Sequence, residues 1–503
     1  MRFMPPLLLC LASPVLAALK LASPFTDHAV LQRELALPVW GMAEGGSMVT
    51  VEFAGQRKTA EATPGGAWRV TFDPLEASAE PRELSVVARL EGKEEGVRLK
   101  DVLVGEVWLA SGQSNMDFTL AKTEKYYFAG VSDEAAEVAA AEHPLIRMFT
   151  GEWARGYEPK AEVPGSWKIC TPGNAREFSA VGYYFARELR EVLDVPVGIV
   201  TLTYGASCAQ AWIRREAIAA DPRLRPLLEK FDAEVRTYQP PSEGELAAWR
   251  AAADQAKVEG KRPPRRPRPD PVQDQHNPTV MFNGMIAPVI PFAIRGVIWY
   301  QGESITAPRE LFPRWNETLI ADWRALWGRE LPFYFVQLAA HRGGDSLPQV
   351  RAWQAEALQL PGTGMAVAID VGDPTNVHPR NKAPVGRRLA LLALNRTYGK
   401  AREDTGPQFA ALTREAGALR VAFTHADGLV ARGGPPNHFE IAAADGRFHP
   451  AEAAIDGTTV LLTAPGVATP VAVRYAWSPY PENCNVYNSA GLPAVPFLAG
   501  LPP

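Results

Sequence analysis

Residues 105–116 read GEVWLASGQSNM, and this stretch decides the expected fold. An apolar run over residues 102–110 ends in a small, polar turn at residues 111–115. A short apolar run bounded by turn residues is typical of a buried strand. Parallel sheets bind ligands beyond the carboxyl ends of their strands. Ser114 is therefore expected to stand at that edge, where it becomes a nucleophile if a base and an oxyanion site lie nearby.

The composition is that of a globular protein with more than one domain. The chain has 503 residues, of which 47% are hydrophobic and 21% are charged, so two or three domains are expected. The net charge is −4, so the chain has no excess of positive charge that would attract a polyanion, and nucleic acid is not an expected partner. Cys208 lies close to a segment that we assign to the active site, but we expect it to be a small buried thiol without a catalytic role. No cysteine has metal-like spacing, and we expect neither a metal nor a cofactor.

The first 17 residues have the pattern of a secretory signal peptide. Arg2 gives a positive start, residues 7–16 are apolar, and residues 15–17 offer small side chains for cleavage. This predicts a secreted or periplasmic protein; the alternative is a first core strand. No other apolar run approaches the length of a membrane span, so none is expected.

Three further regions follow. Residues 18–102 contain short alternating apolar runs with Gly-Gly turns, which predicts a sandwich-like β module. Over 103–400, strand-like runs at 195–202, 297–300, 333–338 and 365–371 alternate with helical stretches such as 178–193. That cadence predicts an α/β domain with a mostly parallel sheet. Residues 401–503 return to short strands with Asp-Gly turns, which predicts a second β-rich module.

Residues 214–280 interrupt the α/β pattern as an insertion. Segments 228–235 and 243–258 have the composition of exposed charged helices, and 261–269 is a basic, proline-rich run. That run is typical of a stiff solvated connector, with a partner-binding role as the alternative. We expect the insertion to overhang the site.

Of the eight histidines, His378 is the best placed to be the base for Ser114. It lies in a loop between the strand-like run 365–371 and a helical stretch at 385–394, on the same sheet edge as Ser114. A helix cap or a surface position is the alternative role, and His341 is the reserve candidate.

Donors for an oxyanion are expected at three strand ends. The backbone N–H of Ser114 can supply one. Gly205 follows a second strand and allows close approach of the backbone to a ligand. Gln301 follows a third strand and brings a side-chain amide, with Gly302 beside it.

Three motifs carry a resemblance to a known family. They are GQSNM at 112–116, WYQGES at 299–304 and DPTNVHPRNK at 373–382. Together with residues 30–33, 178–183, 283–288 and 473–477 they resemble the sialate O-acetylesterase family of the SGNH hydrolases. The resemblance runs over nearly the whole chain. It implies a flavodoxin-like three-layer α/β domain flanked by β-rich modules.

The same resemblance implies roles for individual residues. Ser114 would be the nucleophile, His378 the base, and Gly205 and Gln301 oxyanion donors alongside Ser114. Glu303 would brace the Gln301 loop or be a buried structural carboxylate.

The chain departs from the SGNH pattern at the position of the residue that orients the catalytic histidine. Many SGNH enzymes carry aspartate three residues before the histidine, where this chain has Thr375. Asp373 is predicted to orient His378, with Asp370, Asn376 or a Ser–His pair braced by backbone or amide groups as alternatives.

The sequence thus predicts an esterase that removes acetyl groups from an acetylated carbohydrate through an acyl-Ser114 intermediate. The alternative is a non-catalytic carbohydrate-binding or scaffold protein with a degenerate esterase domain. An esterase or lipase of apolar substrates is a third interpretation. The identity of the glycan (sialic acid, xylan, xyloglucan or pectin) and the oligomeric state are left open.

Overall fold

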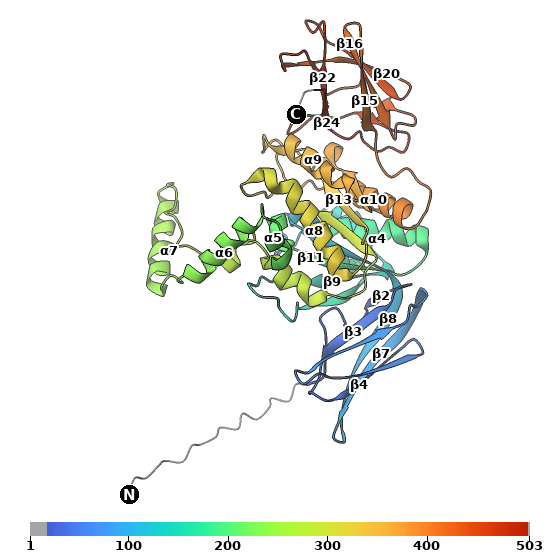
Figure 1. Cartoon of the computed structure of the whole chain (residues 1–503), viewed down its shortest axis with the longest axis vertical. Helices are drawn as coiled ribbons and strands as arrows, with labels where there is room; N and C mark the ends of the chain where they lie inside the picture. Colours follow the sequence, from blue (N-terminus) through green and yellow to red (C-terminus); the bar gives the residue numbers. More distant parts are fainter. Residues whose placement is uncertain (1–17, 501–503) are drawn as a thin grey trace.

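The computed structural model describes residues 18–500, so the predicted signal peptide lies outside the described residues. A mixed α/β body stands between two β-rich regions, and a helical arm projects from its side (Figure 1). The described residues include no helix long and apolar enough to cross a membrane.

The central sheet has the strand order β10-β9-β11-β8-β12-β13-β14. Its strands are parallel to their neighbours except β10, which pairs antiparallel with β9 at one edge. Strands β11, β12, β13 and β14 and the second half of β8 are buried throughout, as a parallel sheet covered on both faces requires. The strands are β8 (Lys93–Gly112), β9 (His143–Gly151), β10 (Gly165–Cys170), β11 (Val197–Thr203), β12 (Gly296–Tyr300), β13 (Phe333–Gln337) and β14 (Thr363–Val367).

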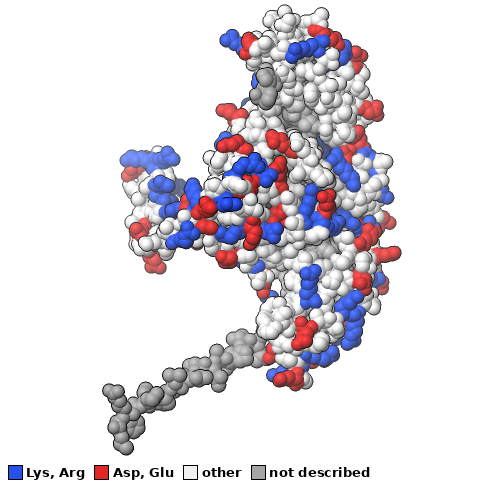
Figure 2. All heavy atoms as spheres, in the orientation of Figure 1, with Lys and Arg blue, Asp and Glu red and all other residues white. Residues whose placement is uncertain are grey.

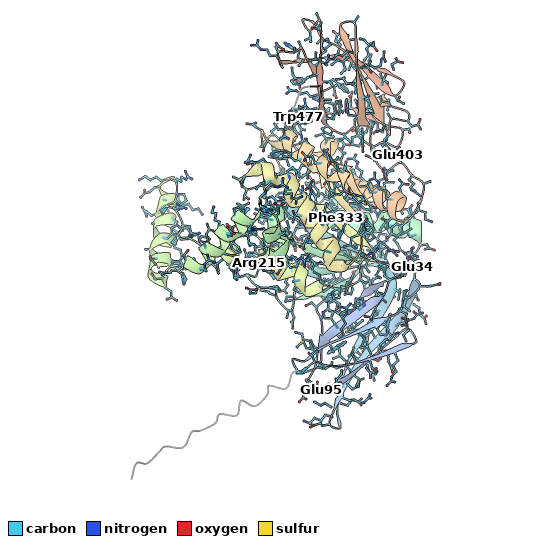
Figure 3. All side chains as sticks on the ribbon, viewed as in Figure 1. Glu34, Glu95, Arg215, Phe333, Glu403 and Trp477 are labelled. Carbon is cyan, nitrogen blue, oxygen red and sulfur yellow. The ribbon has the colours of Figure 1, made fainter. Side chains whose placement is uncertain are left out.

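Helices cover the two faces of this sheet. On one face α4 packs against α10, and their apolar side chains join one buried cluster with Trp108 of β8. On the other face α8 contributes Trp315, Leu319 and Trp323 to a second cluster. Phe333 of β13 lies near the middle of the body in Figure 3. The helices are α1 (Ser114–Asp117), α2 (Glu134–Ala139), α3 (Pro172–Ala175), α4 (Ala180–Leu193), α8 (Phe312–Trp327), α9 (Leu347–Glu356) and α10 (Ala383–Leu392).

Strand β8 continues through the boundary expected at residues 102 and 103. Its first half pairs antiparallel with β7, from Lys93 opposite Leu90 onward. Its second half pairs parallel with both β11 and β12. The N-terminal strands form one small sheet, β1-β3-β6, and an extension of the central sheet through β2, β4, β5 and β7. They are β1 (Lys20–Leu21), β2 (Val30–Gln32), β3 (Leu37–Met42), β4 (Met48–Phe53), β5 (Gln56–Glu61), β6 (Ala67–Phe72) and β7 (Ser78–Leu90).

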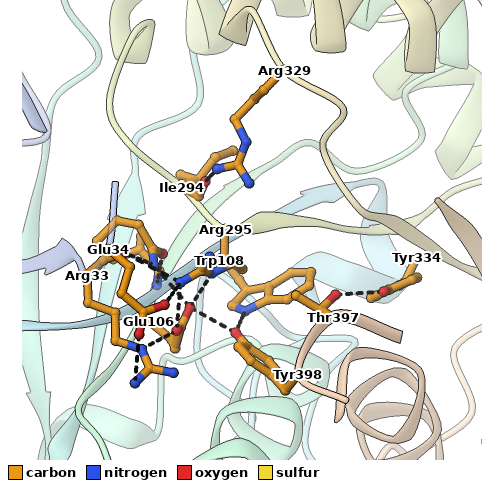
Figure 4. A network of polar contacts seen from close by, with 12 residues as sticks. Arg33, Glu34, Glu106, Trp108, Ile294, Arg295, Arg329, Tyr334, Thr397 and Tyr398 are labelled. Atoms are coloured by element: carbon orange, nitrogen blue, oxygen red, sulfur yellow. Dashed lines mark hydrogen bonds and ion pairs between the residues drawn. The ribbon is translucent and has the colours of Figure 1, made fainter. Parts of the chain in front are cut away.

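A buried carboxylate joins the N-terminal strands to the body. Glu106 of β8 is fully buried and accepts hydrogen bonds from Arg33, Arg295, Gln32 and the hydroxyl of Tyr398 (Figure 4). Burial alone would raise the pKa of Glu106, but the two guanidinium groups outweigh it and hold the pKa below its ordinary value. The carboxylate therefore stays charged and links three separate segments of the chain.

The prediction for residues 365–371 was too long. Strand β14 ends at Val367, where its partner β13 ends at Gln337, and a 3-10 turn over Ile369–Val371 follows. Asp370 on that turn forms a bidentate ion pair with Arg388 at 2.7 Å. A run of apolar residues does not reveal where its hydrogen-bonding partner stops.

The insertion forms an arm made of α5 (Arg215–Ala220), α6 (Arg225–Thr237) and α7 (Glu243–Val258). Arg215 anchors its base through bonds of 2.7 and 2.8 Å to Asp232 (Figure 3). Helix α7 buries no residue and projects away from the body instead of overhanging it (Figure 1). Lys and Arg side chains gather on the arm, while both signs of charge are interspersed over the rest of the visible face (Figure 2).

The C-terminal strands form two four-stranded sheets, β15-β16-β21-β20 and β19-β18-β22-β24, and the pair β17-β23. Buried Arg351 of α9 ties this region to the body by donating to the carbonyl oxygens of Ser478 and Pro479 at 2.8 and 2.9 Å. The strands are β15 (Gln408–Glu415), β16 (Ala418–Thr424), β17 (Val430–Ala431), β18 (Phe439–Ala442), β19 (Phe448–Pro450), β20 (Glu452–Asp456), β21 (Thr459–Thr463), β22 (Ala472–Tyr475), β23 (Val486–Tyr487) and β24 (Phe497–Ala499).

Candidate active site

The turn after β8 delivers Ser114 to the carboxyl edge of the sheet. Gly112 has φ +130°, and a Cβ atom there would lie 2.2 Å from the carbonyl oxygen of Tyr300, so only glycine lets β8 and β12 approach this closely. The N–H of Gln113 then donates to that same oxygen at 2.9 Å. Ser114 begins the one-turn helix α1 and is 9% exposed.

The structure brings Ser114 and His378 together. The Oγ of Ser114 and the Nε2 of His378 are 2.7 Å apart, although the residues are 264 positions apart in the chain. His378 is half-buried in the loop between β14 and α10, and the ring of Phe128 lies 4.7 Å from its imidazole, centroid to centroid. A hydroxyl and an imidazole at this distance can exchange a proton.

The surroundings of His378 favour its neutral form. Burial, then the charge of Lys382 and then that of His341 lower the pKa of His378 to about 4. A neutral imidazole has a lone pair free to accept a proton, which is the state that a general base needs.

Two backbone N–H groups beside Ser114 are free to hold an oxyanion. The described residues supply no acceptor to the N–H of Ser114 or of Gly205. Gly205 follows β11, and a Cβ atom built on it would lie 3.8 Å from the Cβ of Ser114. Gly205 is therefore a neighbour of Ser114, and the N–H groups of both residues are available as donors for the oxyanion hole of the proposed reaction.

Gln301 is differently placed. It is buried, and its Nε2 lies within hydrogen-bonding distance of the Oε1 of Gln113 and the carbonyl oxygens of Ser207 and Ser304, at 3.2, 3.2 and 2.8 Å. These bonds hold three loops of the sheet edge together. One of them must break before the amide can face an oxyanion, so its role as a third donor stays a prediction.

The structure does not bring Asp373 to the imidazole. Its Oδ1 accepts hydrogen bonds from the N–H and hydroxyl of Thr375 and from the N–H of Asn376, which closes the turn ahead of His378. Asn376 accepts from the backbone N–H of His378 at 2.9 Å and not from its ring. Asp370, the other carboxylate considered, is paired with Arg388.

A buried polar network that was not expected lies behind the pair. Asn115 is 1% exposed, and its side-chain oxygen accepts a hydrogen bond from the ammonium of Lys382. Its amide nitrogen donates to Glu303 and, at 3.1 Å, to the carbonyl oxygen of Val377. Glu303 thus braces Asn115 and not Gln301. Asn115 and Lys382 both lie inside the quoted motifs. The signal in the sequence was a polar residue close to each catalytic candidate: Asn115 directly follows Ser114, and Lys382 comes four residues after His378.

A cavity of about 410 Å³ opens beside this network. Its lining includes Gly302 and Glu303 after β12, residues 338–341 and 343–347 after β13, and Val377. The three cysteines of the described residues are free and buried: Cys170, Cys208 and Cys484. The prediction that Cys208 is a small buried thiol is confirmed. No group of three or more His, Cys, Asp or Glu side chains that could hold a metal occurs within residues 18–500.

Comparison with known proteins decides the family. The rat sialate O-acetylesterase is 30% identical over an alignment of 531 positions, gaps included, that covers 95% of this chain and 94% of that protein. The chain belongs to the sialate O-acetylesterase family. The human sialate O-acetylesterase is 27% identical over 95% of this chain and 92% of its own length. The family model described as carbohydrate esterase, sialic acid-specific acetylesterase, matches residues 278–395.

A solved structure agrees with this placement. A carbohydrate acetylesterase from Xanthomonas citri is 35% identical, with a TM-score of 0.79, over 95% of this chain and 99% of that one. Membership of the sialate O-acetylesterase family makes this protein a hydrolase that acts on carboxylic esters. The resemblance found in the sequence is confirmed, and the β-rich regions on either side of the α/β body lie within the matched length.

Proposed function

We propose that this protein hydrolyses acetyl esters on carbohydrates by a serine mechanism, with Ser114 as nucleophile and His378 as base. The observation that carries the proposal is the distance of 2.7 Å between the Oγ of Ser114 and the Nε2 of His378. The low pKa of His378 and the free N–H groups of Ser114 and Gly205 support it.

The reaction runs in two acyl transfers. The Oγ of Ser114 attacks the acetyl carbonyl carbon while His378 takes the hydroxyl proton, and the carbonyl oxygen becomes an oxyanion held by the N–H groups of Ser114 and Gly205. The bond to the sugar oxygen then breaks, and His378 returns the proton to that oxygen. Water then attacks acetyl-Ser114 while His378 takes one of its protons. As the bond between the acyl carbon and the Oγ of Ser114 breaks, His378 gives that proton to the Oγ. Free Ser114 and a neutral imidazole are restored, and acetic acid leaves and ionises to acetate.

The remaining expectations form part of the same proposal. The α/β body is an SGNH-type three-layer domain over residues 103–400, with β modules at 18–102 and 401–503 and a signal peptide at 1–17. The protein is then secreted or periplasmic. Two features support the SGNH-type domain: the sheet with helices on both faces and the serine at its carboxyl edge.

The direct test is labelling followed by substrate profiling. A fluorophosphonate probe should label the purified protein at Ser114 and should leave Ser114→Ala unlabelled. Acetate release should then be measured across a panel of acetylated sialosides and acetylated plant glycans. A protein that is folded but neither labels nor releases acetate would be the non-catalytic carbohydrate-binding alternative.

A further inference from the structure

An arc of four aromatic side chains surrounds one side of the Ser114–His378 pair. Its members are Phe128, Tyr126, Trp153 and Tyr204. Successive ring centroids lie 6.4 Å apart from Phe128 to Tyr126, 6.0 Å from Tyr126 to Trp153, and 5.5 Å from Trp153 to Tyr204. The rings come from three segments: the loop after α1, the end of β9 and the end of β11. We call these four residues the aromatic arc.

Both ends of the arc reach the proposed catalytic pair. At one end the ring of Phe128 lies 4.7 Å from the imidazole of His378. At the other end Tyr204 directly precedes Gly205, and a Cβ atom built on Gly205 would lie 3.8 Å from the Cβ of Ser114. The arc therefore begins at the imidazole of His378 and ends at the residue before Gly205.

The middle of the arc is open to solvent. Trp153 is 42% exposed, whereas its neighbour Tyr126 is 3% exposed and packs edge-on against it at 90°. Lys125 lies 4.7 Å from the Trp153 ring centroid, and Arg155 lies 5.0 Å from that of Tyr204. Arg155 is itself held by a 2.6 Å bond to the carbonyl oxygen of Gln273. These cation–π contacts hold the rings in fixed orientations. The apolar surface of the rings that stays exposed can be buried by a bound ligand.

We propose that the aromatic arc is the subsite for the sugar ring that carries the acetyl group, with Trp153 as its stacking platform. This inference rests on the proposed function, since it assigns a site to the alcohol half of that ester. The C–H face of a pyranose is apolar and slightly positive, and it complements the negative face of an indole ring. A ring stacked on Trp153 has its acetyl group within the arc, which ends at Ser114 and His378.

The test compares two acetyl esters that differ in the alcohol. Glucose pentaacetate presents a pyranose, and ethyl acetate presents none. For Trp153→Ala we expect the ratio of kcat/KM for glucose pentaacetate to that for ethyl acetate to fall at least about fivefold, mainly through KM. Trp153→Phe should restore most of the ratio, because it keeps an aromatic face. Trp249→Ala, which removes an indole from the distant arm, is the matched control and should leave the ratio unchanged.

Each outcome decides one proposal. If Trp153→Ala lowers both constants equally, or neither, the subsite is overturned while the esterase proposal stands. If the wild-type protein hydrolyses ethyl acetate but not the sugar ester, the carbohydrate part of the proposed function fails. Because Trp153 is surface-exposed, its loss should leave the fold intact, and the constant for ethyl acetate reports whether it does.

Discussion

The amide nitrogen of Asn115, the residue after Ser114, donates a hydrogen bond of 3.1 Å to the carbonyl oxygen of Val377, the residue before His378. The two chain segments that carry the proposed nucleophile and base are therefore joined one residue away from the reacting atoms. Lys382 and Glu303 hold the same amide from its other sides. No carboxylate of the described residues orients the imidazole, so we assign part of that task to Asn115.

Replacing Asn115 by alanine should lower kcat/KM about tenfold to a hundredfold, because small displacements of a base from its nucleophile are costly. The rate with 4-nitrophenyl acetate and the melting temperature should be measured together. Asn376→Ala, which removes only a turn contact of the same loop, is the control. A variant Asn115→Ala with wild-type kcat/KM would remove Asn115 from this role.

The activity should persist into acid. Because the pKa of His378 is lowered to about 4, most of the imidazole is neutral at pH 5, where an ordinary histidine would be mostly protonated. The acidic limb of kcat/KM against pH should thus lie near pH 4. A limb near pH 6.5 in the wild-type enzyme would contradict the buried, neutral imidazole.

Lys382→Met tests the cause of that shift. The Lys382 ammonium is the second contribution, after burial, that disfavours the charged imidazole. Removing it should raise the pKa of His378 and move the acidic limb to higher pH, so activity at pH 5 falls relative to activity at pH 8. Lys382→Arg retains the charge and should keep the limb of the wild type, provided that it folds. A limb unmoved in Lys382→Met would show that the charge of Lys382 does not contribute to the low pKa of His378.

Asp373→Ala should be nearly neutral for catalysis. Its carboxylate closes a turn and does not reach the imidazole, so we expect a loss in kcat/KM of less than about threefold, with a small loss of thermal stability. An orienting aspartate of a serine triad is worth about 10⁴ in kcat. Steady-state kinetics separate these outcomes, and a loss of that larger size would restore Asp373 as the orienting residue.

Glu106→Gln should destabilise the protein without changing its chemistry. The substitution leaves Arg33 and Arg295 facing a neutral amide, and breaking a buried pair costs on the order of 3 kcal/mol. The melting temperature should drop, while kcat per folded molecule is retained. Glu83→Gln, at an exposed ion pair with Arg98, is the control and should have almost no effect.

The sequence predicted elements well where one local pattern decides them. The run at 195–202 corresponds to β11 at 197–203, the helical stretch at 243–258 coincides with α7, and Ser114 lies at the carboxyl end of a central parallel strand. Alternation and turn residues are local, so they can be read without knowing the partners of a strand.

What the sequence left open depends on distant partners. The amide nitrogen of Gln301 lies among three acceptor oxygens, from Gln113, Ser207 and Ser304, and no spacing rule predicts them. Asp373 has the right residue type near His378, but its oxygen closes the local turn first, because backbone N–H groups two and three residues ahead compete for it. The contact between Asn115 and Val377 spans 262 positions and appears only after the sheet has formed.

The double membership of β8 has a consequence for how this protein can be divided. The strand that ends beside Ser114 begins in the N-terminal region, pairing with β7 before it enters the parallel sheet. A chain cleaved at residue 102 would leave each fragment with half of β8 and with unpaired backbone groups at the edges of its sheet. Recombination therefore could not exchange the N-terminal region as an intact unit. This region and the hydrolytic body share strand β8, so we expect them to fold and unfold together.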